Sequence, residues 1–342
     1  MQARAYWTTG PGHGQVRPVE LPDPGPDEAL VRTVCSGVSG GTETLVHRGG
    51  VPEAVRDLMR APYQEGDLPG PVKYGYLSVG VVERGPAGWT GRRVFCLYPH
   101  QDRYVVPVDA LSPIPDDVPD ERAVLAGAVE TALNALWDAG PRYGDRLAVI
   151  GGGMIGGAVA ALARRFPLGR LELVDVDPDR AELAAALGVP FATPHAAAGD
   201  CDLVLHCSAT AEGLALALDL LGEEGTCWEV SWYGDATPPV PLGGAFHARR
   251  LSIRASQVGA VSASRRARRT TRDRLGLALA ALADPAFDAL LGDRHAFEDL
   301  PGVMNELAGG RLAAGCQVIR YDRPADRPFD DPTHDEEPLC SA

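Results

Sequence analysis

The stretch that begins at Cys35, CSGVSGGTETLVHRG, gathers side chains that could hold a metal ion or pass a proton. Cys35 and His47 are residue types that ligate transition metals, and Glu43 could orient such a ligand. Ser39 and Thr42 carry hydroxyls, which keep their protons at neutral pH and so relay protons better than they bind metals. The stretch therefore predicts a metal site, a proton relay, or a site that has lost its metal.

A second stretch, VIGGGMIGG, has the spacing G-x-G-x-x-G at Gly151, Gly153 and Gly156. It follows the apolar run LAVI and precedes an alanine-rich run with helical spacing, which is the context of a dinucleotide site. The glycines allow a tight turn, approach of a pyrophosphate to the backbone, and close helix–strand packing. The anion would sit at the helix N-terminus, beside Met154 and Ile155.

The choice of dinucleotide depends on Asp175, which ends the next apolar run nineteen residues after Gly156. A carboxylate there accepts hydrogen bonds from the adenosine ribose and repels the 2′-phosphate of NADP, so NAD is expected. Arg180 is close in sequence and keeps NADP as the alternative.

Further cofactor contacts are expected where later apolar runs end, because ligands bind outside the carboxyl ends of the strands in a parallel sheet. Thr131 is expected beside the nicotinamide. The other expected contacts are Cys207 and Ser208 over the adenosine, Val230 and Ser231 near the nicotinamide, and backbone groups of Ser256 and Val258 for the carboxamide.

Two kinds of structure must position these motifs. Residues 1–120 contain short alternating apolar runs with many glycines and prolines, which predict a β-rich module. Residues 121–139 have helical spacing and predict one helix. Apolar runs then alternate with helical patterns, which predicts a parallel sheet covered on both faces. A late run, GCQVIRYD, is expected to return to the first module as a strand.

Length, charge and cysteine usage narrow the class of protein. A chain of 342 residues predicts two domains, and a formal charge of −14 argues against binding nucleic acid or anionic membranes. No apolar run reaches the roughly 20 residues of a membrane span, and no signal peptide is evident, so a cytoplasmic protein is expected. Seven scattered cysteines predict reduced thiols. The basic run 264–274 is interpreted as a solvated helix start or a contact for an anionic substrate or NADP phosphate.

The motifs GVSGGTE, GYLSVGVVERG and VIGGGMIG…LVDVD, in this order, resemble the medium-chain dehydrogenase/reductase superfamily. The resemblance covers about residues 1–322 and implies an α/β fold with two domains and a homodimer that acts on a small-molecule substrate. A GroES-like catalytic domain would comprise residues 1–125 and 263–322, and a doubly wound Rossmann domain residues 126–262. Residues 323–342 are acidic and proline-rich, and are expected to form a disordered tail.

The resemblance also implies what happened to the metal site. Zinc-dependent members carry motifs that look like G-[IV]-C-G-[ST]-D and G-H-E-x-x-G, whose cysteine and histidine ligate zinc. Here Ser39 and Tyr76 stand at those two positions, and Leu77 replaces the glutamate. Hydroxyls are poor zinc ligands, so no catalytic zinc is expected. Thr42 falls on the proton-relaying hydroxyl and Glu43 on the carboxylate behind the ligands, although as a lone charge Glu43 could equally pair with an arginine.

The first motif is also similar to that of hydroxyethyl-bacteriochlorophyllide dehydrogenases, although Leu77 departs from their second motif. A substitute metal site would have to come from residues without recognised spacing, namely Cys35, Glu43, His47, Glu130 and His100.

Without zinc, a hydroxyl or an acid must polarise the substrate oxygen. Tyr76 could donate to it, or could fill the space of the metal. Glu130 lies in an apolar helical run and falls on the glutamate that approaches the metal in polyol-type members. It is therefore expected to line the cleft, the competing interpretation being a helix-face glutamate in solvent or bonded to Arg142. His47 could be the exposed end of the relay or a surface residue, and Ser39 is a weaker candidate.

These expectations favour a zinc-independent NAD(P)-dependent oxidoreductase that transfers hydride between the nicotinamide and an alcohol or carbonyl substrate. The alternatives are an NAD(P)H-dependent reductase of enones or quinones and a non-catalytic nucleotide-binding sensor.

Overall fold

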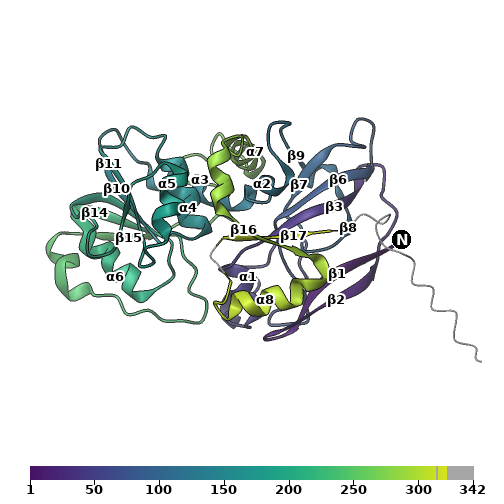
Figure 1. Ribbon diagram of the computed structural model, residues 1–342, viewed down its shortest axis with the longest axis horizontal. Coiled ribbons are helices and arrows are strands. Elements are labelled where there is room, and N and C mark those ends of the chain that lie inside the picture. Colours follow the sequence, from purple (N-terminus) through teal and green to yellow (C-terminus); the bar gives the residue numbers. More distant parts are fainter. Residues whose placement is uncertain (313–314, 322–342) are drawn as a thin grey trace, which may run out of the picture.

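The computed structural model describes residues 1–312 and 315–321. Its β-rich part and its parallel-sheet part lie at opposite ends of the molecule in Figure 1. The tail predicted at 323–342 lies outside the described residues, and the predicted domain boundaries stay predictions.

The β-rich part contains two sheets. One has the order β2-β1-β5-β4, from β1 (Gln2–Gly10), β2 (His13–Glu20), β4 (Glu65–Gly66) and β5 (Val72–Lys73). The other has the order β16-β17-β3-β6-β7-β9, with β8 paired to β3. Its strands are β3 (Glu28–Val38), β6 (Ser78–Arg84), β7 (Arg93–Cys96), β8 (Arg103–Pro107), β9 (Ser112–Pro113), β16 (Leu291–Ala296) and β17 (Cys316–Arg320).

The returning strand is confirmed. Strand β17 pairs antiparallel with β3, so that Gln317 lies opposite Val38. Figure 1 shows the yellow C-terminal strands beside purple β3, which belongs to the start of the chain. The end of the chain therefore contributes side chains to the region built by the first motif.

The parallel sheet has the order β12-β11-β10-β13-β14-β15. Its strands are β10 (Arg146–Ile150), β11 (Arg170–Val174), β12 (Phe191–Ala192), β13 (Cys201–His206), β14 (Leu221–Glu229) and β15 (Ser252–Ala255). Counted along the chain this is the order 3-2-1-4-5-6, in which the connections reverse between β10 and β13. Ligands of such sheets bind at that reversal, beyond the carboxyl ends of the strands.

Helices cover both faces of this sheet, as the strand period of two requires. Leu147 and Val149 of β10 belong to one core with α3 and α4, whereas Ala148 and Ile150 belong to another with Leu214 of α6. The helices of this part are α3 (Ala126–Ala139), α4 (Met154–Ala163), α5 (Arg180–Leu187) and α6 (Ala211–Leu220).

The remaining helices connect or cover the sheets. They are α1 (Thr42–His47), α2 (Asp120–Ala123), α7 (Thr271–Ala281), α8 (Leu300–Ala308) and the short η1 (Glu53–Val55), η2 (Val108–Ala110), η3 (Leu242–Phe246), η4 (Pro285–Leu290) and η5 (Phe297–Asp299). The single helix predicted over 121–139 is wrong, because the chain tightens where the N–H of Leu125 donates to the carbonyl of Arg122 and separates α2 from α3.

The predicted α/β architecture, a β-rich part joined to a doubly wound parallel sheet, is confirmed. Within the described residues no helix is both long and apolar enough to cross a membrane. The six cysteines in that part of the chain are all free thiols.

Candidate cofactor and catalytic site

In the glycine-rich turn between β10 and α4, two of the three motif glycines lie too close to neighbouring backbone atoms to carry a side chain. Gly151 has φ of +102°, and a Cβ there would lie 2.8 Å from the backbone nitrogen of Ser208. A Cβ on Gly156 would lie 1.8 Å from the carbonyl oxygen of Gly151. Gly153 differs, because nothing lies within 4 Å of its Cβ position and no side chain caps α4 there. The turn therefore presents an open helix N-terminus that suits an anion.

Asp175 follows β11 and lies beside this turn. Its carboxylate accepts hydrogen bonds from the N–H of Gly152 at 2.5 Å and of Asp177 at 2.9 Å. Arg180 begins α5, approaches Gly152 with its aliphatic stem, and pairs with Asp177 at 3.3 Å. The two groups expected to decide between NAD and NADP thus lie together at the turn.

A hydrogen-bonded chain follows the ends of β13 and β14. The hydroxyl of Ser208 shares a 2.7 Å hydrogen bond with Nε2 of His206, whose Nδ1 shares another of 2.7 Å with Glu229. His206 and Glu229 are direct partners in the parallel register, which the sequence alone does not reveal. The Ser231 hydroxyl accepts from the N–H of Ala209 at 3.0 Å. These bonds fix the loops that follow the two strands.

Two expected cofactor contacts already have protein partners. The hydroxyl of Ser256 donates to Asp138 at 2.6 Å, and the carbonyl oxygen of Val258 accepts from Arg274 at 2.5 Å. A carbonyl oxygen has a second lone pair, so the Val258 carbonyl can still accept from a carboxamide.

The other expected contacts lie within α3, at the start of α4, or just after β13 and β14. Thr131 donates to the carbonyl of Gly127 within α3 at 2.9 Å. The N–H of Val230 donates to the carbonyl of His206, and Cys207 is half-buried, with its pKa raised by burial. The half-buried side chains that open α4 are Met154 and Ile155.

Three hydroxyls come together at the start of α1. The Tyr76 phenol interacts with the side chains of Ser39 and Thr42. Burial, followed by the nearby Glu43 carboxylate, raises the pKa of Tyr76 well above its ordinary value of 10. Tyr76 therefore keeps its proton at neutral pH and can donate a hydrogen bond. We call Ser39, Thr42 and Tyr76 the hydroxyl cluster.

Glu43 is a buried carboxylate that links the hydroxyl cluster to His100. It is 3% exposed, and its Oε1 accepts from the N–H of Ser39 at 2.8 Å. Its Oε2 lies 2.8 Å from Nε2 of His100, whose Nδ1 lies 2.7 Å from the hydroxyl of Ser36. Gly75 makes room for this histidine, since its φ is +125° and a Cβ there would lie 2.8 Å from the ring. The interpretation that Glu43 pairs with an arginine is wrong.

Leu77 occupies a wholly apolar position. It is fully buried, and Cβ atoms on Gly37 and Gly127 would lie 3.2 Å and 2.5 Å from its methyl groups. Cys316 of β17 enters the same region, because a Cβ on Gly37 would lie 2.6 Å from its sulfur. Sequence reasoning missed Cys316, which only the pairing of β17 with β3 brings here.

Glu130 does not join the hydroxyl cluster through any hydrogen bond of the described residues. It is 4% exposed and accepts from Nε of Arg274, which is 2% exposed, at 3.0 Å. Burial raises the pKa of Glu130, and the guanidinium opposes that shift. The competing interpretation, a glutamate in solvent or bonded to Arg142, is therefore wrong, because Glu130 is buried and its partner Arg274 comes from α7.

His47 is fully buried, so its interpretation as an exposed end of a relay or as a surface residue is wrong. Its Nδ1 lies 3.3 Å from the hydroxyl of Tyr6, and its Nε2 lies 2.9 Å from Oδ1 of Asn305. These contacts tie α1 to β1 and α8. Only the packing of α8 on α1 could have identified them.

The loop after β14 reaches the region of the hydroxyl cluster. Trp232 packs on the same apolar group as Tyr76, a group that includes Leu45. Gly234 lies against Leu45, since a Cβ at Gly234 would be 2.4 Å from a Leu45 methyl group. The carboxyl edge of the parallel sheet is thereby joined to the neighbourhood of Tyr76.

Ser39 and Tyr76, which stand where the resemblance places two zinc ligands, offer only hydroxyls, and hydroxyls fit zinc poorly. A search of residues 1–312 and 315–321 finds no group of three or more His, Cys, Asp or Glu side chains placed to hold a metal.

The fold and the open glycine turn define an α/β chain with a GroES-like part and a Rossmann part that can hold a dinucleotide. No protein-family model matches the sequence. The chain is 31% identical over 121 residues to L-threonine 3-dehydrogenase of Rhizobium rhizogenes, covering 34% of this chain and 33% of that protein. The chain therefore spans about a third of the length of the curated relatives it matches.

Solved structures are similar over almost the whole chain. A protein described as a zinc-binding dehydrogenase from Sinorhizobium meliloti 1021, bound to NADP, is 18% identical with a TM-score of 0.74, covering 94% of this chain and 99% of that one. An alcohol dehydrogenase from Thermus sp. ATN1 is 22% identical with a TM-score of 0.70, covering 93% and 100%. The chain thus has the two-domain fold of these dehydrogenases.

Proposed function

We propose that this chain is a zinc-independent, NAD(P)-dependent oxidoreductase of the medium-chain type that acts on an alcohol or carbonyl substrate. The observation that carries the proposal is the hydroxyl cluster, in which Tyr76 is held protonated beside Ser39 and Thr42. The proposed reaction also needs a place for the dinucleotide, and the open glycine turn supplies it.

The residues at the glycine turn fit a dinucleotide. The vacant Cβ position of Gly153 leaves space for a pyrophosphate, and the uncapped start of α4 offers N–H donors. Asp175 favours the ribose hydroxyls of NAD, and Arg180 supplies a cation that would suit NADP. When bound, the nicotinamide would supply or accept a hydride.

The hydroxyl cluster would handle the substrate oxygen. In carbonyl reduction, Tyr76 donates a hydrogen bond to that oxygen and then its proton, while the carbonyl carbon receives the hydride. Ser39 and Thr42 stabilise the phenolate left behind, and solvent returns the proton. Glu43 acts as a positioning residue, because both of its oxygens are engaged by Ser39 and His100.

The proposal excludes zinc on the chemistry of the donors. Ser39 and Tyr76 would have to lose protons to ligate zinc, and burial makes that loss harder for Tyr76. Leu77 offers no donor atom. No step of the proposed reaction passes through a metal.

The test compares two neighbouring tyrosines, of which only Tyr76 belongs to the hydroxyl cluster. Tyr76→Phe removes the donor, whereas Tyr74→Phe alters the neighbouring ring, 6.0 Å away, that lies outside the hydroxyl cluster. On a panel of alcohols, aldehydes and ketones with NADH and NADPH, we expect Tyr76→Phe to lower kcat by about 100-fold or more. Tyr74→Phe should stay within a few-fold of the wild type. Equal turnover of the two variants would contradict the assignment.

A protonated tyrosine would equally serve a reductase of enones or quinones, so the panel includes both. A protein that binds NADH tightly but turns over nothing on the panel, with or without the Tyr76 substitution, would instead be a nucleotide sensor. The homodimer, the cytoplasmic location and the domain boundaries remain proposals, and analytical ultracentrifugation tests the first of them.

A further inference from the structure

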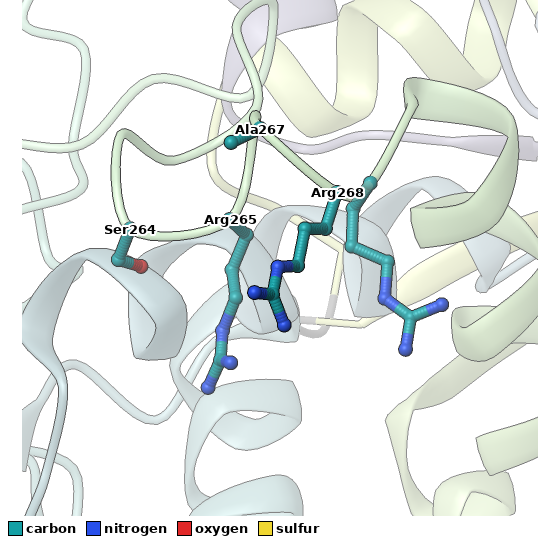
Figure 2. A pocket seen from close by; sticks show the side chains of 5 residues that line it. Ser264, Arg265, Ala267 and Arg268 are labelled. Carbon is teal, nitrogen blue, oxygen red and sulfur yellow. The ribbon is translucent and has the colours of Figure 1, made fainter.

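A loop between β15 and α7 gathers arginines around a hollow. Arg265, Arg268 and Arg269 line it together with Ser264 and Ala267, and its volume is about 390 Å³. Figure 2 shows the side chains of Arg265 and Arg268 leaving the loop toward the same side. The hollow is thus lined mainly by cations from one short segment.

Among the described residues, Arg265 and Arg268 differ from their neighbours in having no carboxylate partner, whereas Arg269 lies near the Asp273 carboxylate. Within residues 1–312 and 315–321, the guanidinium groups of Arg265, Arg266 and Arg268 take part in no hydrogen bond or ion pair. Two arginines just downstream are paired, Arg272 with Asp109 and Arg274 with Glu130. The chain has a formal charge of −14, so this loop carries positive charge on a protein that is negative overall.

The backbone of the loop is held in place before any ligand arrives. The N–H of Arg268 and of Arg269 both donate to the carbonyl of Arg265, at 2.9 Å and 3.0 Å. The Ser264 hydroxyl donates to the carbonyl of Trp137 at 2.8 Å, which anchors the loop to α3. Thr270 then closes the loop by capping α7. Only the arginine side chains need to become ordered on binding.

We propose that this loop binds the phosphate group of a small phosphorylated molecule. Guanidinium groups pair with phosphate oxygens through two parallel hydrogen bonds, and three of them surround one hollow. The hollow suits a small molecule, while the acidic remainder of the chain disfavours an extended polyanion such as nucleic acid. The lining of the hollow includes no residue of the glycine turn, and the proposal does not depend on the proposed reaction.

Calorimetric titration with sodium pyrophosphate at constant ionic strength tests the site. The double variant Arg265→Gln/Arg268→Gln should weaken binding to the loop by about tenfold or more. Arg266→Gln is the matched control, because Arg266 is exposed and unpaired in the same loop but does not line the hollow. It should change the affinity by no more than about twofold, the effect of one screened charge. All variants keep the glycine turn, so any binding there persists throughout.

A second arm identifies the source of the phosphate. If the double variant weakens NADPH binding but not NADH binding, the phosphate belongs to the cofactor; if it weakens only pyrophosphate binding, the ligand is a separate molecule. Both results support the site. Pyrophosphate affinity that is unchanged in the double variant, or reduced equally in Arg266→Gln, would overturn it.

Discussion

Replacement of Arg274 by methionine tests whether Glu130 is held as a buried ion pair. The guanidinium is 2% exposed and donates to Glu130 at 3.0 Å, to Asn134 at 2.5 Å, and to the carbonyls of Val258 and Ala260. Methionine fills similar space but leaves the carboxylate buried without a partner. Breaking a buried pair in this way costs about 3–5 kcal/mol, so Arg274→Met should lower the free energy of unfolding by that amount at neutral pH.

The loss should depend on pH with a defined sign. Burial already raises the pKa of Glu130, and removal of the guanidinium raises it further. A folded-state pKa above the unfolded value gives stability below the unfolded pKa that is lost as pH rises through the folded pKa. The deficit of Arg274→Met should therefore be smallest in acid, near the ordinary glutamate pKa of about 4.3, and largest at neutral pH.

Urea unfolding of matched variants measures both effects. Arg272→Met is the control, because this arginine pairs with Asp109 at the surface and its loss should cost no more than about 1 kcal/mol. Adding Glu130→Gln to Arg274→Met should recover part of the stability at neutral pH. A deficit below about 1 kcal/mol, or one that is the same at every pH, would refute the buried-pair account.

The remaining predictions concern the glycine turn and Leu77. Gly153→Ala should fold with unchanged stability, since its Cβ meets open space, yet bind NADH about tenfold or more weakly in a fluorescence titration. Gly156→Ala should instead lower the melting temperature, because its Cβ would lie 1.8 Å from the Gly151 carbonyl; unchanged melting would show that the turn is wrong. Leu77→Glu should destabilise by several kcal/mol at neutral pH and less in acid, measured by urea unfolding, because it buries a carboxylate. If Leu77→Glu lowered the free energy of unfolding equally at neutral and acid pH, the result would contradict an apolar environment that excludes water.

The glycine-rich turn could be predicted because its determinants are local. The strand, the three glycines and the helix follow one another. Gly151 and Gly156 are sterically required within the turn, and Gly153 leaves open space beside it. Strand β17 was also predictable, because its apolar run GCQVIRYD is typical of a strand. Both expectations rest on patterns that a short window of sequence contains.

The buried polar pairs could not be predicted, because they join residues that are distant in the chain. Glu43 meets His100 across 57 residues, and Glu130 meets Arg274 across 144. The sequence identified Glu130 as a carboxylate in an apolar run and Glu43 by its place in the first motif, but no nearby residue indicates either partner. His206 and Glu229 likewise depend on the register of β13 against β14.

Ser39, Thr42 and Tyr76 illustrate the intermediate case. Their positions within two motifs suggested a common site, and the phenol interacts with both hydroxyls.

The central claim is that a hydroxyl cluster, without zinc, serves hydride transfer. The most direct measurement is the rate of NAD(P)H oxidation on the carbonyl panel by protein whose zinc content has been determined by mass spectrometry, before and after treatment with a chelator. The account predicts turnover that is independent of zinc content and unaffected by the chelator. Turnover that is abolished by the chelator and restored only by added zinc would contradict it.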